Sequence, residues 1–141
     1  EPEHPMALST LRTTYHLLGR QEEAIEMWRA SYTSGGNPEA VEALDRGYAE
    51  GGYSAALTAA AETLARQAEV RFVPAWQIGT LYTRAGNGEA ALDWLERAFE
   101  ERGPNLPYLA VDPIFDDIRP DPRFQTLIER LGLSGYMASS P

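Results

Sequence analysis

The chain has 141 residues, 43% of them hydrophobic and 23% charged, which suits one folded domain of ordinary size. Its formal net charge is −9, and all 12 basic residues are arginine. We therefore expect no nucleic-acid partner and no membrane partner, because phosphate backbones and anionic lipids attract clustered cations. The absence of cysteine excludes disulfides, thiol catalysis and thiolate zinc sites.

No signal peptide and no stretch of 18 apolar residues is present, and we expect a cytoplasmic location. The chain begins at Glu1 rather than at a methionine, so we also expect it to be part of a longer protein.

A pattern of six positions recurs three times along the chain, which predicts a repeat of 33 to 34 residues. The first copy comprises Leu8, Leu11, Tyr15, Gly19, Ala24 and Trp28. The third copy lies 67 residues further on and comprises Ala75, Ile78, Tyr82, Gly86, Ala91 and Leu95. The middle copy, which matches least well, comprises Val41, Leu44, Tyr48, Gly52, Leu57 and Ala61.

Within each copy the apolar residues follow helical spacing. The pattern predicts six helices, at residues 5–18, 21–34, 38–51, 53–69, 72–85 and 88–101. Gly19, Gly52 and Gly86 fall just after the first helix of each copy, where a left-handed C-cap favours glycine. Asn37 and Asn87 are expected to cap the helices that follow them. Since the predicted loops are short, successive helices should pack antiparallel, which makes the fold all-α.

The C-terminal segment, residues 104–133, carries two further helix starts. Asp112 and Asp121 each precede a proline, a pair typical of an N-cap followed by the first helical residue. Phe115 and Phe124 come about one turn later and are expected to cover the last helix pair. We expect residues 134–141 to form a flexible tail.

The repeat resembles the tetratricopeptide repeat, over about residues 5–103. The third copy carries the resemblance best, because Gly79 provides the small residue that lets the two helices of a unit approach closely. Arg12 and Asp45 occupy that position in the first two copies, and Leu57 replaces an expected alanine. The C-terminal segment is similar to the extension found on the tetratricopeptide regions of bacterial multidomain regulators.

The resemblance implies one domain, residues 1–141, built as a right-handed superhelix of antiparallel helix pairs with a C-terminal capping helix. The helix pairs would span residues 5–36, 38–70 and 72–103. In this family the first helix of each unit lines a concave face that binds a partner. The residues placed there by register, together with a nearby cation, are Ser9, Thr13, His16, Glu42, Arg46, Trp76, Thr80, Thr83 and Arg84.

Trp76 is open to two interpretations, since a tryptophan at helical spacing is either a core residue or an exposed anchor for a ligand. Some family members bind the C-terminal carboxylate of a peptide through Lys and Asn on this face. The chain has neither residue at those positions, so we do not expect that mode of recognition.

Catalytic and metal-binding patterns are missing from the sequence. His4 and His16 lie 12 residues apart, outside any metal-ligand motif. Among the acidic residues Asp112, Asp116, Asp117 and Asp121, the two that precede proline are explained as helix caps, and Arg119 and Arg123 could neutralise the others. We therefore expect no enzymatic activity, no cofactor and no metal.

The function expected is that of a non-enzymatic protein–protein interaction module, which binds a protein or peptide on its concave face as part of a larger bacterial regulatory protein. One alternative is self-association as a homodimer, through exposed Tyr53, Leu57 and Leu64. A second alternative is a sensor that holds a small molecule between the repeats.

Overall fold

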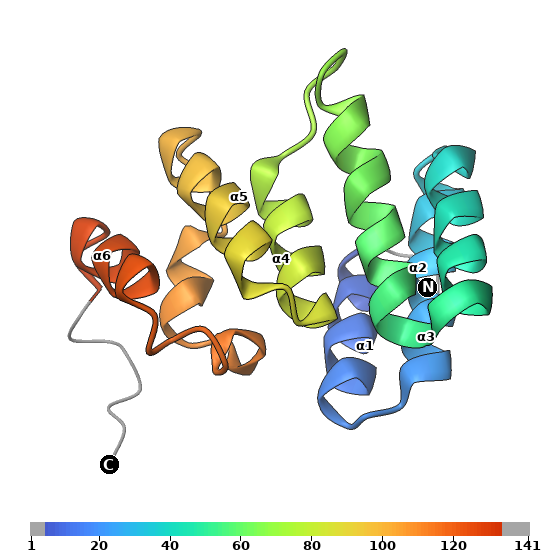
Figure 1. Cartoon of the computed structure of the whole chain (residues 1–141), viewed down its shortest axis with the longest axis horizontal. Helices are drawn as coiled ribbons and strands as arrows, with labels where there is room; N and C mark the ends of the chain where they lie inside the picture. The colour runs from blue at the N-terminus through green and yellow to red at the C-terminus, as the bar shows by residue number, and fades with distance from the viewer. Residues whose placement is uncertain (1–4, 134–141) are drawn as a thin grey trace. The chain divides into compact units, whose positions relative to one another are not determined.

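The computed structural model describes residues 5–133, with side chains described from residue 11 onward, and all its regular elements there are helices (Figure 1). The elements are α1 (Pro5–Leu17), α2 (Gln21–Ser34), α3 (Pro38–Gln67), α4 (Ala75–Ala85), α5 (Gly88–Glu100), the short 3₁₀ helices η1 (Leu106–Ala110) and η2 (Pro113–Phe115), and α6 (Pro122–Arg130). The chain forms two compact units, which divide between Phe72 and Val73. The predicted all-helical class is confirmed.

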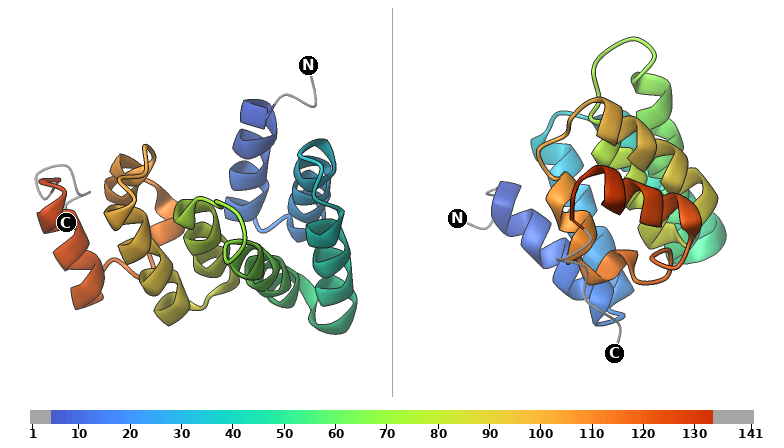
Figure 2. Two further views of the ribbon diagram at one scale, coloured as in Figure 1. Left: turned by 90° about the horizontal axis from the view of Figure 1, so that it is seen from above. Right: turned by 90° about the vertical axis from the view of Figure 1, so that its left-hand side faces the viewer.

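In the first unit, α1 packs on α2 and α2 packs on α3. The long helix α3 is two helices joined at one residue, because Gly52 has φ 85° and ψ −157°, a conformation that side chains with a Cβ rarely adopt. The start and end of α3 lie side by side, since Asn37 and Gln67 exchange two hydrogen bonds of 2.9 Å. The two halves are therefore antiparallel, as expected for residues 38–51 and 53–69, and Figure 2 shows the reversal.

The helix ends follow the predicted chemistry. Gly19, Gly52 and Gly86 all have positive φ, at 73°, 85° and 86°. Asn37 and Asn87 each accept a hydrogen bond of 3.2 Å from the backbone N–H three residues on. These two interactions satisfy N–H groups that the first turn of a helix leaves unpaired.

One expectation about the first unit was wrong. Tyr53, Leu57 and Leu64 are buried, with 8%, 0% and 3% of their surface exposed, and cannot supply an exposed dimer face. The three residues lie on one face of the second half of α3, beside the buried alanines Ala56, Ala60 and Ala61. Ala43, in the first half of α3, is also buried. Tyr53 is covered by Trp28 of α2 and His16 of α1, whose rings lie 6.2 Å and 5.7 Å from its own.

The second unit is built on the antiparallel pair α4 and α5, which approach closely at Gly79. A Cβ on Gly79 would lie 3.0 Å from Leu95 Cδ2, so a larger side chain would push the helices apart. At the start of α4, the backbone N–H of Ala75 donates to Glu101 Oε1 at 3.0 Å. This hydrogen bond links the start of α4 to the end of α5. The small residue expected in the third copy therefore has the role that the resemblance implied.

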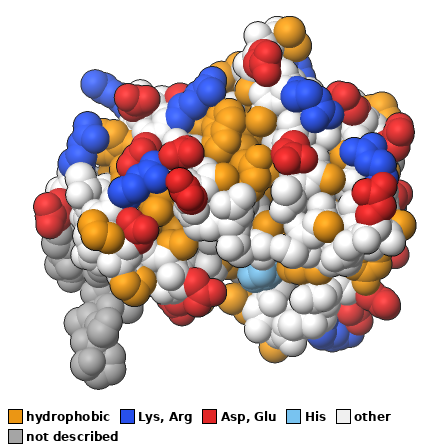
Figure 3. Space-filling view, viewed as in Figure 1, with side chains coloured by type: hydrophobic (Ala, Val, Ile, Leu, Met, Phe, Trp, Pro, Cys, Tyr) orange, Lys and Arg blue, Asp and Glu red, His pale blue; other side chains and the backbone are white. Residues whose placement is uncertain are grey.

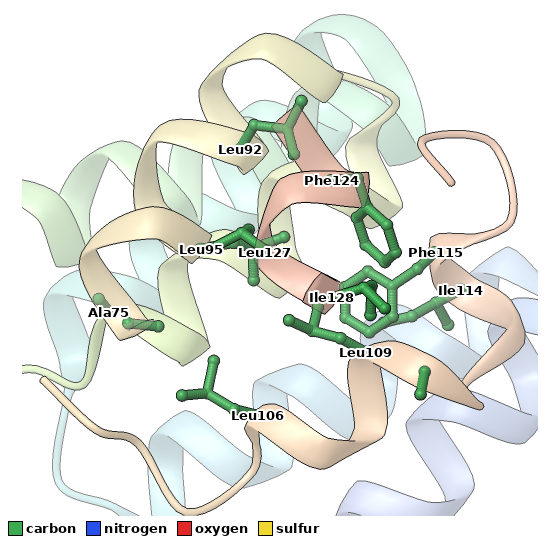
Figure 4. Packing of buried hydrophobic residues seen from close by; sticks show 12 residues of the cluster. Ala75, Leu92, Leu95, Leu106, Leu109, Ile114, Phe115, Phe124, Leu127 and Ile128 are labelled. Carbon is green, nitrogen blue, oxygen red and sulfur yellow. The ribbon is translucent and has the colours of Figure 1, made fainter. Parts of the chain in front are cut away.

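The segment after α5 folds over that pair and completes a hydrophobic core (Figure 4). Phe115 and Phe124 are fully buried, with ring centroids 6.0 Å apart, among residues of α4, α5, η1 and α6. Asp112 and Asp121 cap η2 and α6 by accepting backbone hydrogen bonds of 3.1 Å and 2.8 Å. The predicted covering role of the two phenylalanines and both predicted caps are confirmed, whereas the expected tail at 134–141 lies outside the described residues.

Candidate functional site

A hollow on the first unit lies where α2 ends and α3 begins. Its volume is about 650 Å³, and its lining residues are Thr33, Gly36, Asn37, Pro38, Val41, Glu42, Asp45 and Arg46. The turn that shapes it is set by Gly36, which has φ 71°, and by the Asn37 cap with Pro38 as the first helical residue. This cavity, called the α2–α3 pocket below, contains two of the predicted groove residues, Glu42 and Arg46.

Glu42 and Arg46 are one helical turn apart and both are exposed. The third charged lining residue, Asp45, is already engaged, because Arg29 donates to its Oδ1 from Nε at 2.9 Å and from Nη2 at 2.6 Å. This hydrogen bond to Asp45 is the main reason that the pKa of Arg29 is raised. Within the described residues neither Glu42 nor Arg46 has an ion pair, so both charges are open to a ligand beside the apolar Val41 and Pro38.

The predicted groove residues of α1 contribute in different ways. His16 Nδ1 lies 2.6 Å from the hydroxyl of Tyr53, and the two rings stack. Its imidazole is therefore engaged in joining α1 to α3. Thr13 is half-buried on the same helix, and the side chain of Ser9 lies outside the described part of the structure.

The predicted groove residues of α4 belong to the second unit, and their polar groups are mostly used locally. Thr80 is buried and its hydroxyl donates to the carbonyl of Gln77 at 3.1 Å. The Thr83 hydroxyl donates to the carbonyl of Gly79 at 2.8 Å, one turn back. Arg84 is half-buried. These hydroxyls act as part of the helix and offer a ligand little hydrogen-bonding capacity.

Trp76 is half-buried at the edge of the second unit's core. Its ring centroid lies 5.6 Å from that of Phe115, at an interplanar angle of 58°, a tilted arrangement favoured between aromatic rings. One side of the Trp76 ring therefore packs in the core, in agreement with the first of the two interpretations given for this residue.

Sequence reasoning missed most of the α2–α3 pocket, including Thr33 and Val41. The signal was present in the Asn37–Pro38 turn, which was interpreted only as a helix start. A second missed feature is Arg12, which replaces the small residue of the repeat. It lies with its guanidinium 5.7 Å from the Trp28 ring and donates to Ser31 Oγ at 2.6 Å, and burial lowers its pKa.

Charged side chains are distributed in opposite-sign pairs over the surface, as the face in Figure 3 shows. Arg119 pairs with Asp116 at 2.9 Å, as expected, but Arg123 pairs with Asp93 and Glu96 of α5 at 2.6 Å and 2.7 Å. The two hydrogen-bonded carboxylates raise the pKa of Arg123, Glu96 contributing most.

Over the described residues, no group of three or more His, Cys, Asp or Glu side chains is placed to hold a metal ion. In the same part of the chain, every helix is too short or too polar to cross a membrane. The arrangement at the α2–α3 pocket is suited to non-covalent contact, with an apolar floor and two charges of opposite sign.

Comparison with known protein families, curated proteins and solved structures gave no match to this chain. The similarity to tetratricopeptide repeats therefore depends on the residues and spacing given above.

Proposed function

We propose that the chain is a non-enzymatic protein–protein interaction module built from tetratricopeptide-like helix pairs. In this proposal the pairs stack as a right-handed superhelix, and the first helix of each pair faces a bound protein or peptide. The proposal includes a role within a larger bacterial regulatory protein in the cytoplasm, with no cofactor.

The α2–α3 pocket is the observation that supports this function most directly. Helix packing leaves Glu42 and Arg46 exposed side by side at an apolar hollow, where their charges have no ion-pair partner among the described residues. Such a surface suits an extended peptide that places an aliphatic side chain on Val41 and Pro38 and polar groups on the two charges.

Peptide selection from a display library tests this proposal. The selected peptides should bind the whole chain, and Arg46→Glu or Glu42→Arg should weaken that binding about tenfold, since each reverses a charge at the contact. Arg20→Glu, on an exposed arginine of the same unit, is the matched control. Peptides that bind all four proteins equally would remove the α2–α3 pocket from the proposal.

In the second unit, Trp76→Ala is a poor probe of ligand binding, because loss of the ring would also disturb its packing on Phe115. The exchange Trp76→Phe keeps an aromatic ring at that position. If Trp76 anchors a ligand, this exchange should weaken binding while the melting temperature changes little.

Self-association as a homodimer is the second candidate function. It would use other residues than Tyr53, Leu57 and Leu64, because those three are buried. Leu17 and Leu18 at the end of α1 are 48% and 65% exposed, and adjacent exposed leucines favour contact with another apolar surface. Light scattering at two protein concentrations tests it. A mass that stays at 15.6 kDa at both concentrations would rule out the homodimer.

A further inference from the structure

A second hollow lies in the second unit, where α5 ends, η1 begins and α6 ends. Its volume is about 410 Å³, and its lining residues are Phe99, Arg102, Gly103, Pro104, Leu106, Pro107 and Leu131. Six of these seven residues offer apolar surface, so Arg102 is the only charged group in the lining. This cavity is called the α5–α6 pocket below.

The backbone of Arg102 has an unusual conformation. Its φ is 56°, and it is the only residue other than glycine with positive φ in the described part of the chain. The other left-handed positions there are Gly19, Gly36, Gly52, Gly86 and Gly132. A Cβ makes this conformation unfavourable, so glycine would be the expected residue after α5 as well.

Hydrogen bonds of the helix end hold Arg102 in this conformation. Its N–H donates to the Phe99 carbonyl at 3.0 Å, and the N–H of Gly103 donates to the Ala98 carbonyl at 3.1 Å. These bonds would form equally well with glycine at position 102, so the fold alone does not call for an arginine. Strain kept at a pocket edge is typical of functional positions.

The charge of Arg102 is also unmatched. Its guanidinium makes no hydrogen bond or ion pair with any described residue. The guanidinium of Arg130 likewise has no hydrogen bond or ion pair with a described residue. Its Cζ lies 4.4 Å from the centroid of the Phe99 ring. The nearby carboxylate of Glu101 is occupied, because it pairs with Arg97 at 3.5 Å and accepts from the Ala75 N–H. Arg102 therefore lines an apolar hollow, and Arg130 stacks on Phe99 of the same lining. Among the described residues neither guanidinium has a carboxylate partner, although the net charge of the chain is −9.

We propose that the α5–α6 pocket binds an acidic peptide segment that carries one aliphatic or aromatic side chain. The apolar side chain lies against Phe99, Leu106 and Leu131, and a neighbouring carboxylate pairs with Arg102. Arg130, stacked on Phe99, adds a second positive charge beside that carboxylate. This site lies in a different unit from the α2–α3 pocket, and it does not depend on the function proposed for that pocket.

The test uses the whole chain and two fluorescein-labelled decapeptides, followed by fluorescence anisotropy. Both peptides contain a central Leu-Phe pair, flanked by Asp and Glu in one and by Asn and Gln in the other. We expect the acidic peptide to bind at least tenfold more tightly, and added salt to reduce that difference.

Three variants separate binding from folding. Arg102→Gly should weaken binding of the acidic peptide about tenfold or more and leave the melting temperature unchanged or higher, because glycine suits the left-handed backbone. Arg102→Lys should keep most of the binding, and Arg71→Ala, which removes an exposed arginine from the first unit, should keep all of it. Binding that Arg46→Glu abolishes and Arg102→Gly leaves intact would belong to the α2–α3 pocket and would overturn this proposal, so failure here is distinguishable from failure of the α2–α3 pocket.

Equal binding of the two peptides, or full binding by Arg102→Gly, would overturn the proposal. Displacement of the acidic peptide by a single-stranded oligonucleotide at lower concentration than by unlabelled peptide would also overturn it, since the site would then recognise phosphate.

Discussion

Gly47 lies directly against the backbone of Ala55, around the corner that Gly52 makes in α3. A Cβ on Gly47 would stand 2.6 Å from the Ala55 carbonyl oxygen and 2.8 Å from the Cα of Ala56. The two halves of α3 therefore touch through backbone atoms, which cannot move aside as a flexible side chain can. In the middle pair, Gly47 provides the close approach that Gly79 provides between α4 and α5.

The first prediction follows from that contact. Gly47→Ala should lower the free energy of unfolding by about 1–3 kcal/mol, because the overlap outweighs the gain in helix propensity of about 1 kcal/mol. Urea unfolding followed by circular dichroism measures it. Gly103→Ala is the control, since its Cβ would stay 3.7 Å from the nearest atom, and a Gly47→Ala protein as stable as the original would contradict the packing described.

Arg119 is predicted to be the most important arginine for the stability of the second unit. Its guanidinium donates to the carbonyls of Leu109 and Asp112 at 2.8 Å each and to that of Ala110 at 3.3 Å, which fixes the end of η1. Arg119→Ala should cost about 2–4 kcal/mol, and Arg119→Lys should recover little, because an ammonium cannot span the three carbonyls.

Thermal and urea unfolding of these variants provide the measurement. Arg20→Ala is the control, as its exposed pair with Glu23 should contribute nothing measurable. Recovery of full stability by Arg119→Lys would show that charge alone, and not the fork of donors, matters at this position.

Replacing Arg12 with methionine is predicted to maintain or increase the stability of the protein, unlike the substitutions described above. Its guanidinium is largely buried, burial lowers its pKa, and its Nε has no hydrogen-bond partner within the described residues. Arg12→Met should leave the free energy of unfolding unchanged or raise it by about 1 kcal/mol, because a buried cation without a carboxylate is unfavourable. Arg12→Ala should instead be destabilising, since it removes the contact with Trp28. A large loss of stability in Arg12→Met would mean that the hydrogen bond to Ser31 outweighs the burial of charge.

Phe115 is predicted to be the residue whose truncation most damages the second unit. It is fully buried between Trp76 and Phe124, so Phe115→Ala should cost about 3–5 kcal/mol and Phe115→Leu much less. Tyr108→Ala, at an exposed aromatic of η1, serves as the reference. Near-ultraviolet circular dichroism reports the loss directly, because Trp76 packs on this ring. An Ala variant with the original melting temperature would contradict the core assignment.

The helices and their ends were predictable from the sequence because the information is local. A glycine with positive φ, an Asn or Asp cap and a following proline act within a few residues, so Gly52, Asn37 and Asp121 could be assigned without knowing the fold. The all-α class followed from the spacing of apolar residues for the same reason.

The exposure of individual side chains was less predictable, because it depends on what other helices cover. Tyr53 was expected at the surface and is buried under Trp28 and His16, which come from earlier helices. The hydroxyls of Thr80 and Thr83 lie at positions that a groove could use, but they bond to their own helix. The left-handed Arg102 had no sequence signal, since glycine is the residue that identifies such a position.

The reversal at Gly52 also limits how this chain can vary in length. A connection of one residue leaves no slack, so inserted residues there would separate Gly47 from Ala55 and open the middle pair. Residues 68–74 form a longer irregular connection between α3 and α4, where Val70 and Phe72 are exposed. Insertions, epitope tags and the first cuts of a protease should therefore be accepted between α3 and α4 and refused within α3.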